Sequence, residues 1–123
     1  MKISCTALDK KFSVYIRMRA GYRCERMTKN CSSKMECSHY HGRRKQSVRF
    51  DHENCSCLCF TCHRYFTENP SAHTAWMKKK LGEDRYNALL VRANRCGKPD
   101  YELLNLALSR KIKELENNQE MVP

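Results

Sequence analysis

Apolar residues recur at helical spacing near the N-terminus of the chain and fall on one helix face. The residues at this spacing are Leu8, Phe12, Tyr15 and Ile16, followed by Arg19. The other face carries the basic residues Lys10, Lys11 and Arg17, and Gly21 is a residue type that commonly ends helices. The pattern therefore predicts an N-terminal helix within residues 1–21.

Three further helices are predicted in residues 69–118, each with its own start and stop signals. Asn69 followed by Pro70 is a typical helix start, because Asn caps free N–H groups and Pro suits the first helical position. The expected helices run from Asn69 to Leu81 and Gly82, from Glu83 and Asp84 to near Cys96, and onward from Pro99 and Asp100. Apolar residues expected on the buried sides of the last two are Tyr86, Leu89, Leu90, Ala93, Leu104, Leu108, Ile112 and Leu115. We interpret these helices as a scaffold, followed by a frayed tail of residues 119–123.

Shorter elements are predicted between the N-terminal helix and this scaffold. In order they are a polar loop (22–35), a strand (35–40), a second strand (47–50), a loop (51–56) and a helix (59–66). The sequence HGRRKQ between the strands supplies the glycine and the charge expected of a hairpin connection. The prediction is an α+β fold in one domain, residues 1–123, in which a small ββα core of residues 22–68 carries an N-terminal helix and C-terminal helices.

The charge of the chain favours a polyanionic partner. Lys and Arg number 24 against 13 Asp and Glu, a net charge of +11 with a pI of about 9.4. Residues 1–50 hold thirteen basic and three acidic side chains, whereas residues 51–123 hold eleven and ten. No apolar run approaches the roughly 18 residues of a membrane span, and the N-terminal MKISCTALDKK lacks the apolar core of a signal peptide. We therefore expect a cytoplasmic protein that does not enter a membrane.

Nine cysteines in 123 residues indicate either disulfides or metal ligation. A reducing cytoplasm disfavours disulfides, so we favour a structural zinc site, which is usually tetrahedral with sulfur and nitrogen ligands. Cys59 and Cys62 have the C-x2-C spacing of a zinc knuckle and supply two ligands. The alternative is that the cysteines are reduced thiols in a hydrophobic core.

The other two zinc ligands should lie upstream of this knuckle. Cys24 stands where a second knuckle would begin, but Met27 occupies the position of its second cysteine. Cys31 or Cys37 must then complete the site. We prefer Cys31. Cys37 lies two residues before His39, on the same face of the predicted strand, so we expect Cys37 to belong to the wall of an active site.

Three polar residues, His39, Asn54 and His63, occur along the chain in the order His–Asn–His that is found in HNH nucleases. His63 directly follows the C-x2-C pair. Longer segments extend this similarity over nearly the whole chain, namely LDKKFSVYIRMR, CSHY, SVRFDHEN, CFTCHRYF, ENPSAHTAW and KIKELE. The chain thus resembles the phage NinG and Rap recombination endonucleases, within the HNH (ββα-metal) nucleases. The resemblance implies a zinc-stabilised enzyme that hydrolyses DNA with Mg²⁺ or Mn²⁺ and acts on branched recombination intermediates.

The family pattern implies a role for each of the three residues. His39, at the end of the first strand, would be the general base, since a histidine pKa near neutrality suits it to take a proton from water. His63 would hold the catalytic cation. Asn54 would hold the loop and orient His39. In the alternative, His39 and His63 are hydrogen-bonded structural histidines, or His63 completes the zinc site.

A second ligand for the cation is less apparent. Many HNH motifs have Asp or His directly before the base, where this chain has Ser38. Glu36, Asp51 or His41 could supply this ligand. His41 is our first candidate, because it follows the base by two residues and shares its strand face, and Glu36 is the next. We expect His52 to be a loop residue and His73 to face solvent.

Four basic residues are expected to contact DNA phosphates: Arg43, Arg44, Lys45 and Arg49. They surround the predicted site, although a merely solvated hairpin tip would have the same composition. Two other functions stay open: an HNH nuclease that nicks duplex DNA with little structural preference, and a catalytically inactive zinc module that binds DNA. We expect a junction-cutting enzyme to act as a homodimer.

Overall fold

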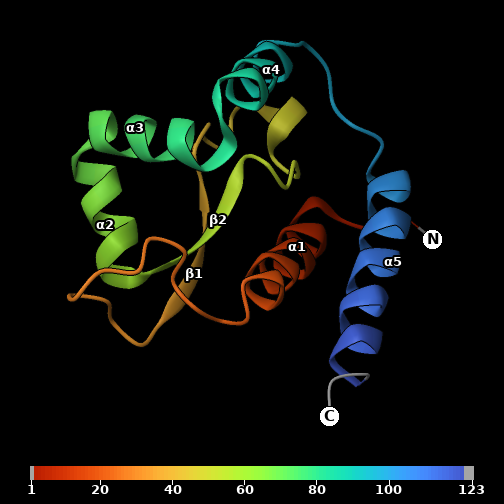
Figure 1. Cartoon of the computed structure of the whole chain (residues 1–123). Helices are drawn as coiled ribbons and strands as arrows, with labels where there is room; N and C mark the ends of the chain where they lie inside the picture. The colour runs from red at the N-terminus through yellow and green to blue at the C-terminus, as the bar shows by residue number, and fades with distance from the viewer. Residues whose placement is uncertain (1, 121–123) are drawn as a thin grey trace.

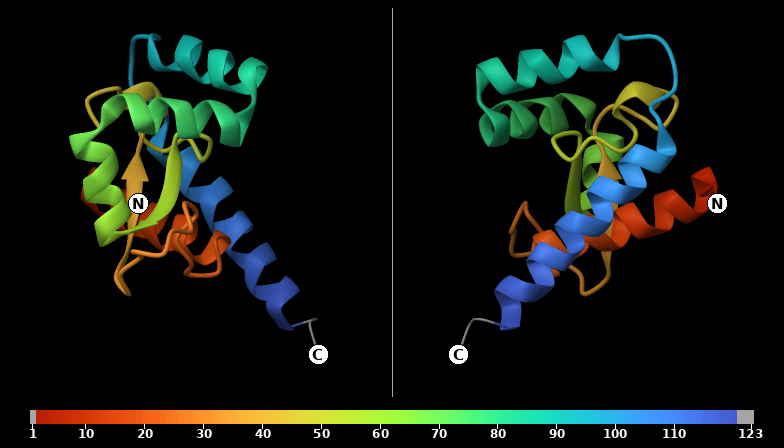
Figure 2. Two further views of the ribbon diagram at one scale, coloured as in Figure 1. Left: turned by 60° about the vertical axis from the view of Figure 1, so that its left-hand side comes forward. Right: turned by 90° about the vertical axis from the view of Figure 1, so that its right-hand side faces the viewer.

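The computed structural model describes residues 2–120 and has a two-stranded hairpin between two groups of helices (Figure 1). The elements are α1 (Cys5–Arg19), β1 (Met35–His39), the 3-10 turn η1 (Gln46–Val48), β2 (Cys55–Cys59), α2 (Phe60–Glu68), α3 (Pro70–Leu81), α4 (Glu83–Ala93) and α5 (Tyr101–Glu120). Helices α1 and α5 cover one side of the hairpin, and α2 and α3 lie on the other, as the views in Figure 2 also show. The expected α+β arrangement of an N-terminal helix, a hairpin and C-terminal helices is confirmed.

The two strands pair antiparallel, from Met35 opposite Cys59 to His39 opposite Cys55. Because side chains alternate along a strand, the hairpin has two different faces. The face toward α1 carries Cys37, His39, Cys55 and Cys57, and the face toward α2 carries Glu36, Ser38, Ser56 and Leu58. All five residues of β2 are buried, as expected of a strand with helices on both faces.

The predicted second strand, residues 47–50, is wrong. This segment forms η1 and a turn, and β2 lies instead at Cys55–Cys59, which overlaps the predicted loop of residues 51–56. Val48 and Phe50 have strand-like spacing, but they enter different cores: Val48 packs with α3 and α4, whereas Phe50 packs edge-on against Phe12 of α1 at 5.7 Å. The basic segment HGRRKQ therefore belongs to the long connection between the strands.

Helices α1 and α5 form the larger core against the hairpin. The apolar face predicted for α1 is buried, and the residues predicted on the face of α5 pack against it: Leu104, Leu108, Ile112 and Leu115. Lys11 Nζ donates to Asn105 Oδ1 at 2.7 Å, and the Ile3 N–H donates to Glu102 Oε1 at 2.8 Å. Figure 2 shows α5 crossing α1.

Helix α3 begins and ends where the sequence predicts, although the Asn69 side chain makes no capping hydrogen bond. Helix α4 begins at the predicted Glu83 but ends at Ala93, earlier than the predicted end near Cys96. Pro70 opens α3, and Gly82, with φ of 80°, separates it from α4 in a conformation that suits glycine. Leu90 of α4 is 41% exposed, so its predicted burial is wrong. The last helix continues to Glu120, and residues 121–123 of the predicted frayed tail lie outside the described residues.

Candidate functional site

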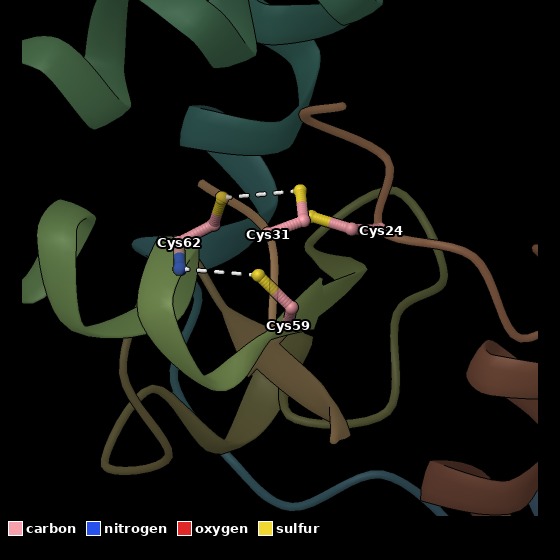
Figure 3. Close-up of side chains that lie close together, drawn as sticks. All are labelled: Cys24, Cys31, Cys59 and Cys62. Carbon is pink, nitrogen blue, oxygen red and sulfur yellow. Dashed lines mark hydrogen bonds between the residues drawn. The ribbon is translucent and has the colours of Figure 1, made fainter. Parts of the chain in front are cut away.

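Four cysteine thiols gather at the junction of β2, α2 and the loop that follows α1 (Figure 3). They are Cys24, Cys31, Cys59 and Cys62, whose sulfur atoms all lie within 4.8 Å of one another. Cys31 Sγ and Cys62 Sγ are 3.9 Å apart. A tetrahedral zinc ion with Zn–S bonds of about 2.3 Å has sulfur–sulfur edges of about 3.8 Å, whereas a disulfide is about 2.05 Å long. The spacing fits a shared structural metal such as zinc.

The geometry selects Cys31, and not Cys37, as the upstream partner of Cys24. Met27 is 77% exposed and has a positive φ of 53°, so its side chain points away from the thiols while the loop turns back toward them. Four thiols complete the set without His63. The predicted set of four cysteines is therefore brought together in the fold.

Backbone and side-chain donors surround the four thiols. The Cys62 N–H donates to Cys59 Sγ at 3.4 Å, and the Thr28 N–H donates to Cys31 Sγ at 3.3 Å. Burial raises the pKa of the Cys59 thiol, but hydrogen bonds from Cys62 and Ser32 outweigh it and bring the pKa to about 6. Burial raises the pKa of Cys62 to about 12, so metal binding would release a proton from that thiol.

A second group of donors lies on the α1 face of the hairpin. A ring nitrogen of His39 and the sulfur atoms of Cys37 and Cys55 lie within 4.8 Å of one another. Sequence reasoning placed Cys37 beside His39 but did not assign Cys55. Cys55 pairs with His39 in the sheet. This partner was missed because the second strand was predicted at the wrong residues.

His39 is held by the connection between the strands. Its Nε2 lies 2.8 Å from the carbonyl oxygen of Arg49, and because a carbonyl only accepts, Nε2 carries the proton and Nδ1 keeps a lone pair. Burial lowers the pKa of His39, which favours the neutral ring. Arg49 is itself fixed by Asp9 of α1, whose Oδ1 accepts from Arg49 Nε at 3.0 Å.

Asn54 is fully buried and holds the same connection in place. Its Oδ1 accepts from the His41 N–H at 2.8 Å, and its Nδ2 donates to the carbonyl oxygens of His41 at 2.9 Å and Val48 at 3.1 Å. The loop-holding contacts expected for Asn54 are thus present. They reach the residues that follow His39, and the Tyr40 N–H donates to the Asn54 carbonyl at 2.9 Å.

His63 lies in the first turn of α2 and faces β1. Its Nδ1 is 2.8 Å from Glu36 Oε1, so the pair is hydrogen-bonded across the α2 face of the hairpin. Glu36, our second candidate for a cation ligand, is therefore the carboxylate that positions His63. A histidine that donates to a carboxylate through one nitrogen presents the other as a metal donor, an arrangement common in metal sites.

A groove of about 380 Å³ runs between the end of β1, α2 and α3. It is lined by four of the five histidines, His39, His41, His63 and His73, together with Ser38, Tyr40, Phe66, Thr67, Pro70 and Thr74. His41 Nε2 is buried and has no hydrogen-bond partner within residues 2–120. Among the residues that the structure describes, neither group of clustered metal donors includes His41 or His63.

The expectation that His73 faces solvent is wrong. Its ring stacks on Phe66 at a centroid distance of 4.5 Å with an interplanar angle of 2°, and meets Tyr40 edge-on at 4.9 Å. Burial lowers the pKa of His73 to about 4. No sequence signal indicated this position, because it depends on how α3 folds back over α2.

The four predicted phosphate-binding residues divide into two groups. Arg43, Arg44 and Lys45 are exposed and form none of the ion pairs found in residues 2–120. Arg49 is paired with Asp9, so its guanidinium stabilises the packing of the connection on α1. The acid missing from the sequence-based picture was Asp9, forty positions away from Arg49.

Comparisons with protein-family models, with curated proteins and with solved structures found no match for this chain. Within the described residues, no helix is both long enough and apolar enough to cross a membrane.

Proposed function

We propose that the protein is a zinc-stabilised endonuclease of the HNH type, which hydrolyses phosphodiester bonds of DNA with a catalytic divalent cation. The observation that carries this proposal is the setting of His39. Its Nε2–H donates to the Arg49 carbonyl at 2.8 Å, and burial lowers its pKa, so a neutral ring keeps an unprotonated Nδ1. A fixed, neutral imidazole of this kind suits a general base at neutral pH.

In the proposed reaction, His39 Nδ1 accepts a proton from the water molecule whose oxygen forms the new bond to phosphorus. The bond from phosphorus to the leaving sugar oxygen breaks as this bond forms. The Arg49 carbonyl accepts the hydrogen bond from Nε2–H and stabilises the positive ring that results. Asp9 and Asn54 hold the connection that carries Arg49, so the ring keeps one orientation.

The groove also offers donors for a catalytic cation. His63 would hold the ion through Nε2, because Nδ1 is engaged with Glu36, and the buried Nε2 of His41 is a second donor at the same groove. Mg²⁺ or Mn²⁺ bound there would neutralise charge on the phosphate and the leaving oxygen. A zinc ion bound by the four cysteines would also help to fix the position of His63, because Cys62 directly precedes it in the chain.

DNA would approach over residues 41–45, the segment that Asn54 holds beside the groove. Arg43, Arg44 and Lys45 are exposed there and would neutralise phosphates next to the scissile bond. Branched recombination intermediates are the substrates that the resemblance to NinG and Rap implies. A homodimer would present two such grooves to the two strands of a junction, as paired cuts require.

A second candidate is a DNA-binding zinc module without catalysis. One observation favours it: within residues 2–120, His41 and His63 are not part of any group of three metal donors closer than 4.8 Å. This module would use the same basic residues and the same zinc site.

Cleavage assays separate these candidates. The purified protein is incubated with labelled four-way-junction DNA or linear duplex, in Mg²⁺ or Mn²⁺, beside His39→Ala and the control His52→Ala, which alters an exposed loop histidine. We expect the wild type and His52→Ala to cut, and His39→Ala to lose on the order of 10²- to 10⁴-fold in rate. Binding without cleavage would support the inactive module. Equal cutting of both DNAs would support a nuclease without structural preference.

A further inference from the structure

The Cys37, His39 and Cys55 group is separate from the four-cysteine cluster and has its own ligand geometry. Cys37 precedes His39 by two residues on β1, and His39 stands opposite Cys55 in the antiparallel register. Their three donor atoms lie within 4.8 Å of one another, although no residue is shared with the other cluster. Cys55 is fully buried and Cys37 is partly buried, so the group faces the α1 core.

The contact made by His39 is one that metal-bound histidines use. Its Nε2–H donates to the Arg49 carbonyl at 2.8 Å, which fixes the ring and leaves Nδ1 as the free donor. The connection behind this carbonyl is held rigidly by Asp9 and Asn54. The orientation of the imidazole ring is therefore fixed before any ion binds.

The charge around Cys37 favours a thiolate. A hydrogen bond from Cys55 lowers the pKa of Cys37, and the nearby guanidinium groups of Arg43, Arg19 and Arg17 lower it further against the effect of burial. Burial raises the pKa of Cys55 well above its ordinary value, so an ion bound there would have to displace the proton of that thiol. A neighbouring cysteine on the same face, Cys57, has its pKa raised to about 11 by burial and belongs to neither donor group.

We propose that Cys37, His39 and Cys55 form a second metal site, for thiophilic ions such as Zn²⁺ or Cd²⁺, and that its occupation blocks His39. Two sulfur ligands and one imidazole select such ions over Mg²⁺ and Mn²⁺, which prefer oxygen. Three protein ligands leave a fourth position to water. An ion on Nδ1 takes the lone pair that would accept a proton from water, so the nuclease would stop. Only this last consequence rests on the proposed function.

Metal counting tests the site without DNA. The zinc-containing protein is titrated with Cd²⁺, freed of unbound metal by gel filtration, and analysed for total zinc plus cadmium, with thiolate-to-cadmium absorption recorded in parallel. We expect two ions per chain in the wild type and one in Cys37→Ser, with weaker thiolate absorption in the variant. Cys57→Ser is the matched control, since it removes a neighbouring thiol from the same face, and it should keep two ions.

A total of one ion in the wild type, or two in Cys37→Ser, would overturn the second site, as would an equal loss in Cys57→Ser. If Cys37→Ser fails to fold, His39→Gln removes the nitrogen donor and should bind one ion. Inhibition is a separate measurement: with Mg²⁺ present, the second equivalent of Zn²⁺ should stop cleavage by the wild type, whereas Cys37→Ser should keep whatever rate it has before that addition. Undiminished cleavage with two ions bound would refute the block, whereas no cleavage under any condition would refute only the nuclease.

Discussion

His73 makes the stability of the protein depend on pH through one buried imidazole. Burial between Phe66 and Tyr40 lowers its pKa to about 4, with smaller contributions from the charges of His63 and Lys80, while an unfolded histidine has a pKa of about 6.5. Between these two values the unfolded chain binds a proton that the folded chain does not. The free energy of unfolding therefore falls as pH is lowered through this range, by about 2 kcal/mol from this residue between about pH 7 and pH 5.

Urea unfolding of the wild type and His73→Phe at these two pH values measures this contribution. Phenylalanine keeps the stack on Phe66 but has no titratable group, so the variant should lose less stability at the lower pH. Some dependence will remain, because burial also lowers the pKa values of His39 and His41. The same loss in both proteins would show that the His73 ring is not buried as described.

Single residues differed in how far their surroundings could be predicted. The C-x2-C spacing pointed to Cys59 and Cys62, but the upstream pair did not follow from spacing, because Met27 interrupts the second knuckle and Cys31 was preferred to Cys37 only because Cys37 lies beside His39. The environments of His73 and Cys55 depend on the packing of α3 over α2 and on the strand register, which no local pattern encodes. Asp9, the partner of Arg49, was missed for the same reason.

At the scale of elements, the four-cysteine site links the loop of residues 22–34 to the end of β2 and the first turn of α2. This loop has few apolar residues, so a metal bound by the four thiols would supply much of its attachment. Cys59→Ser should release one zinc ion per chain and destabilise the protein by at least about 3 kcal/mol, since structural zinc contributes on the order of 10 kcal/mol in small zinc domains.

Zinc analysis and thermal unfolding check this prediction, and limited proteolysis shows whether cleavage begins in residues 22–34. Cys96→Ser is the control, because Cys96 is exposed and lies in neither donor group. Removal of zinc by a chelator should reproduce the Cys59→Ser result in the wild type. A zinc-free protein with an unchanged melting temperature would mean that the four thiols do not hold a structural metal.

The bounds of the helices were predictable to within a few residues. Of the two strands, only β1 was predicted at the right residues. Each helix carries several apolar residues at helical spacing and clear end signals, such as Pro70 and Gly82, which reinforce one another. The strand β2 reads CSCLC, and cysteine serves equally as a core residue and as a ligand, so its burial on both faces left no alternating pattern. Two apolar residues in another segment, Val48 and Phe50, imitated a strand instead.

Among the described residues, folding pairs several acidic groups with basic side chains, whereas the exposed basic segment of residues 43–45 keeps no such partner. Asp51 and Glu53 are paired with Arg92 and Arg85, and Asp9 with Arg49. In the part of the chain that the structure describes, residues 43–45 are exposed, and they closely follow His41, which lines the groove.

DNA binding should consequently depend on salt through these residues. Each phosphate neutralised by Arg or Lys contributes about −0.9 to the slope of log K against log salt concentration, because bound counterions are released. The double variant Arg43→Ala with Arg44→Ala should flatten that slope by about 2. The control double variant, Lys79→Ala with Lys113→Ala, removes the same charge from exposed positions on α3 and α5. It should leave the slope nearly unchanged. Fluorescence anisotropy with labelled duplex over a range of salt concentrations measures both slopes. Equal flattening by the two double variants would mean that DNA senses only the total charge, and flattening by the second alone would place the DNA on the helical scaffold.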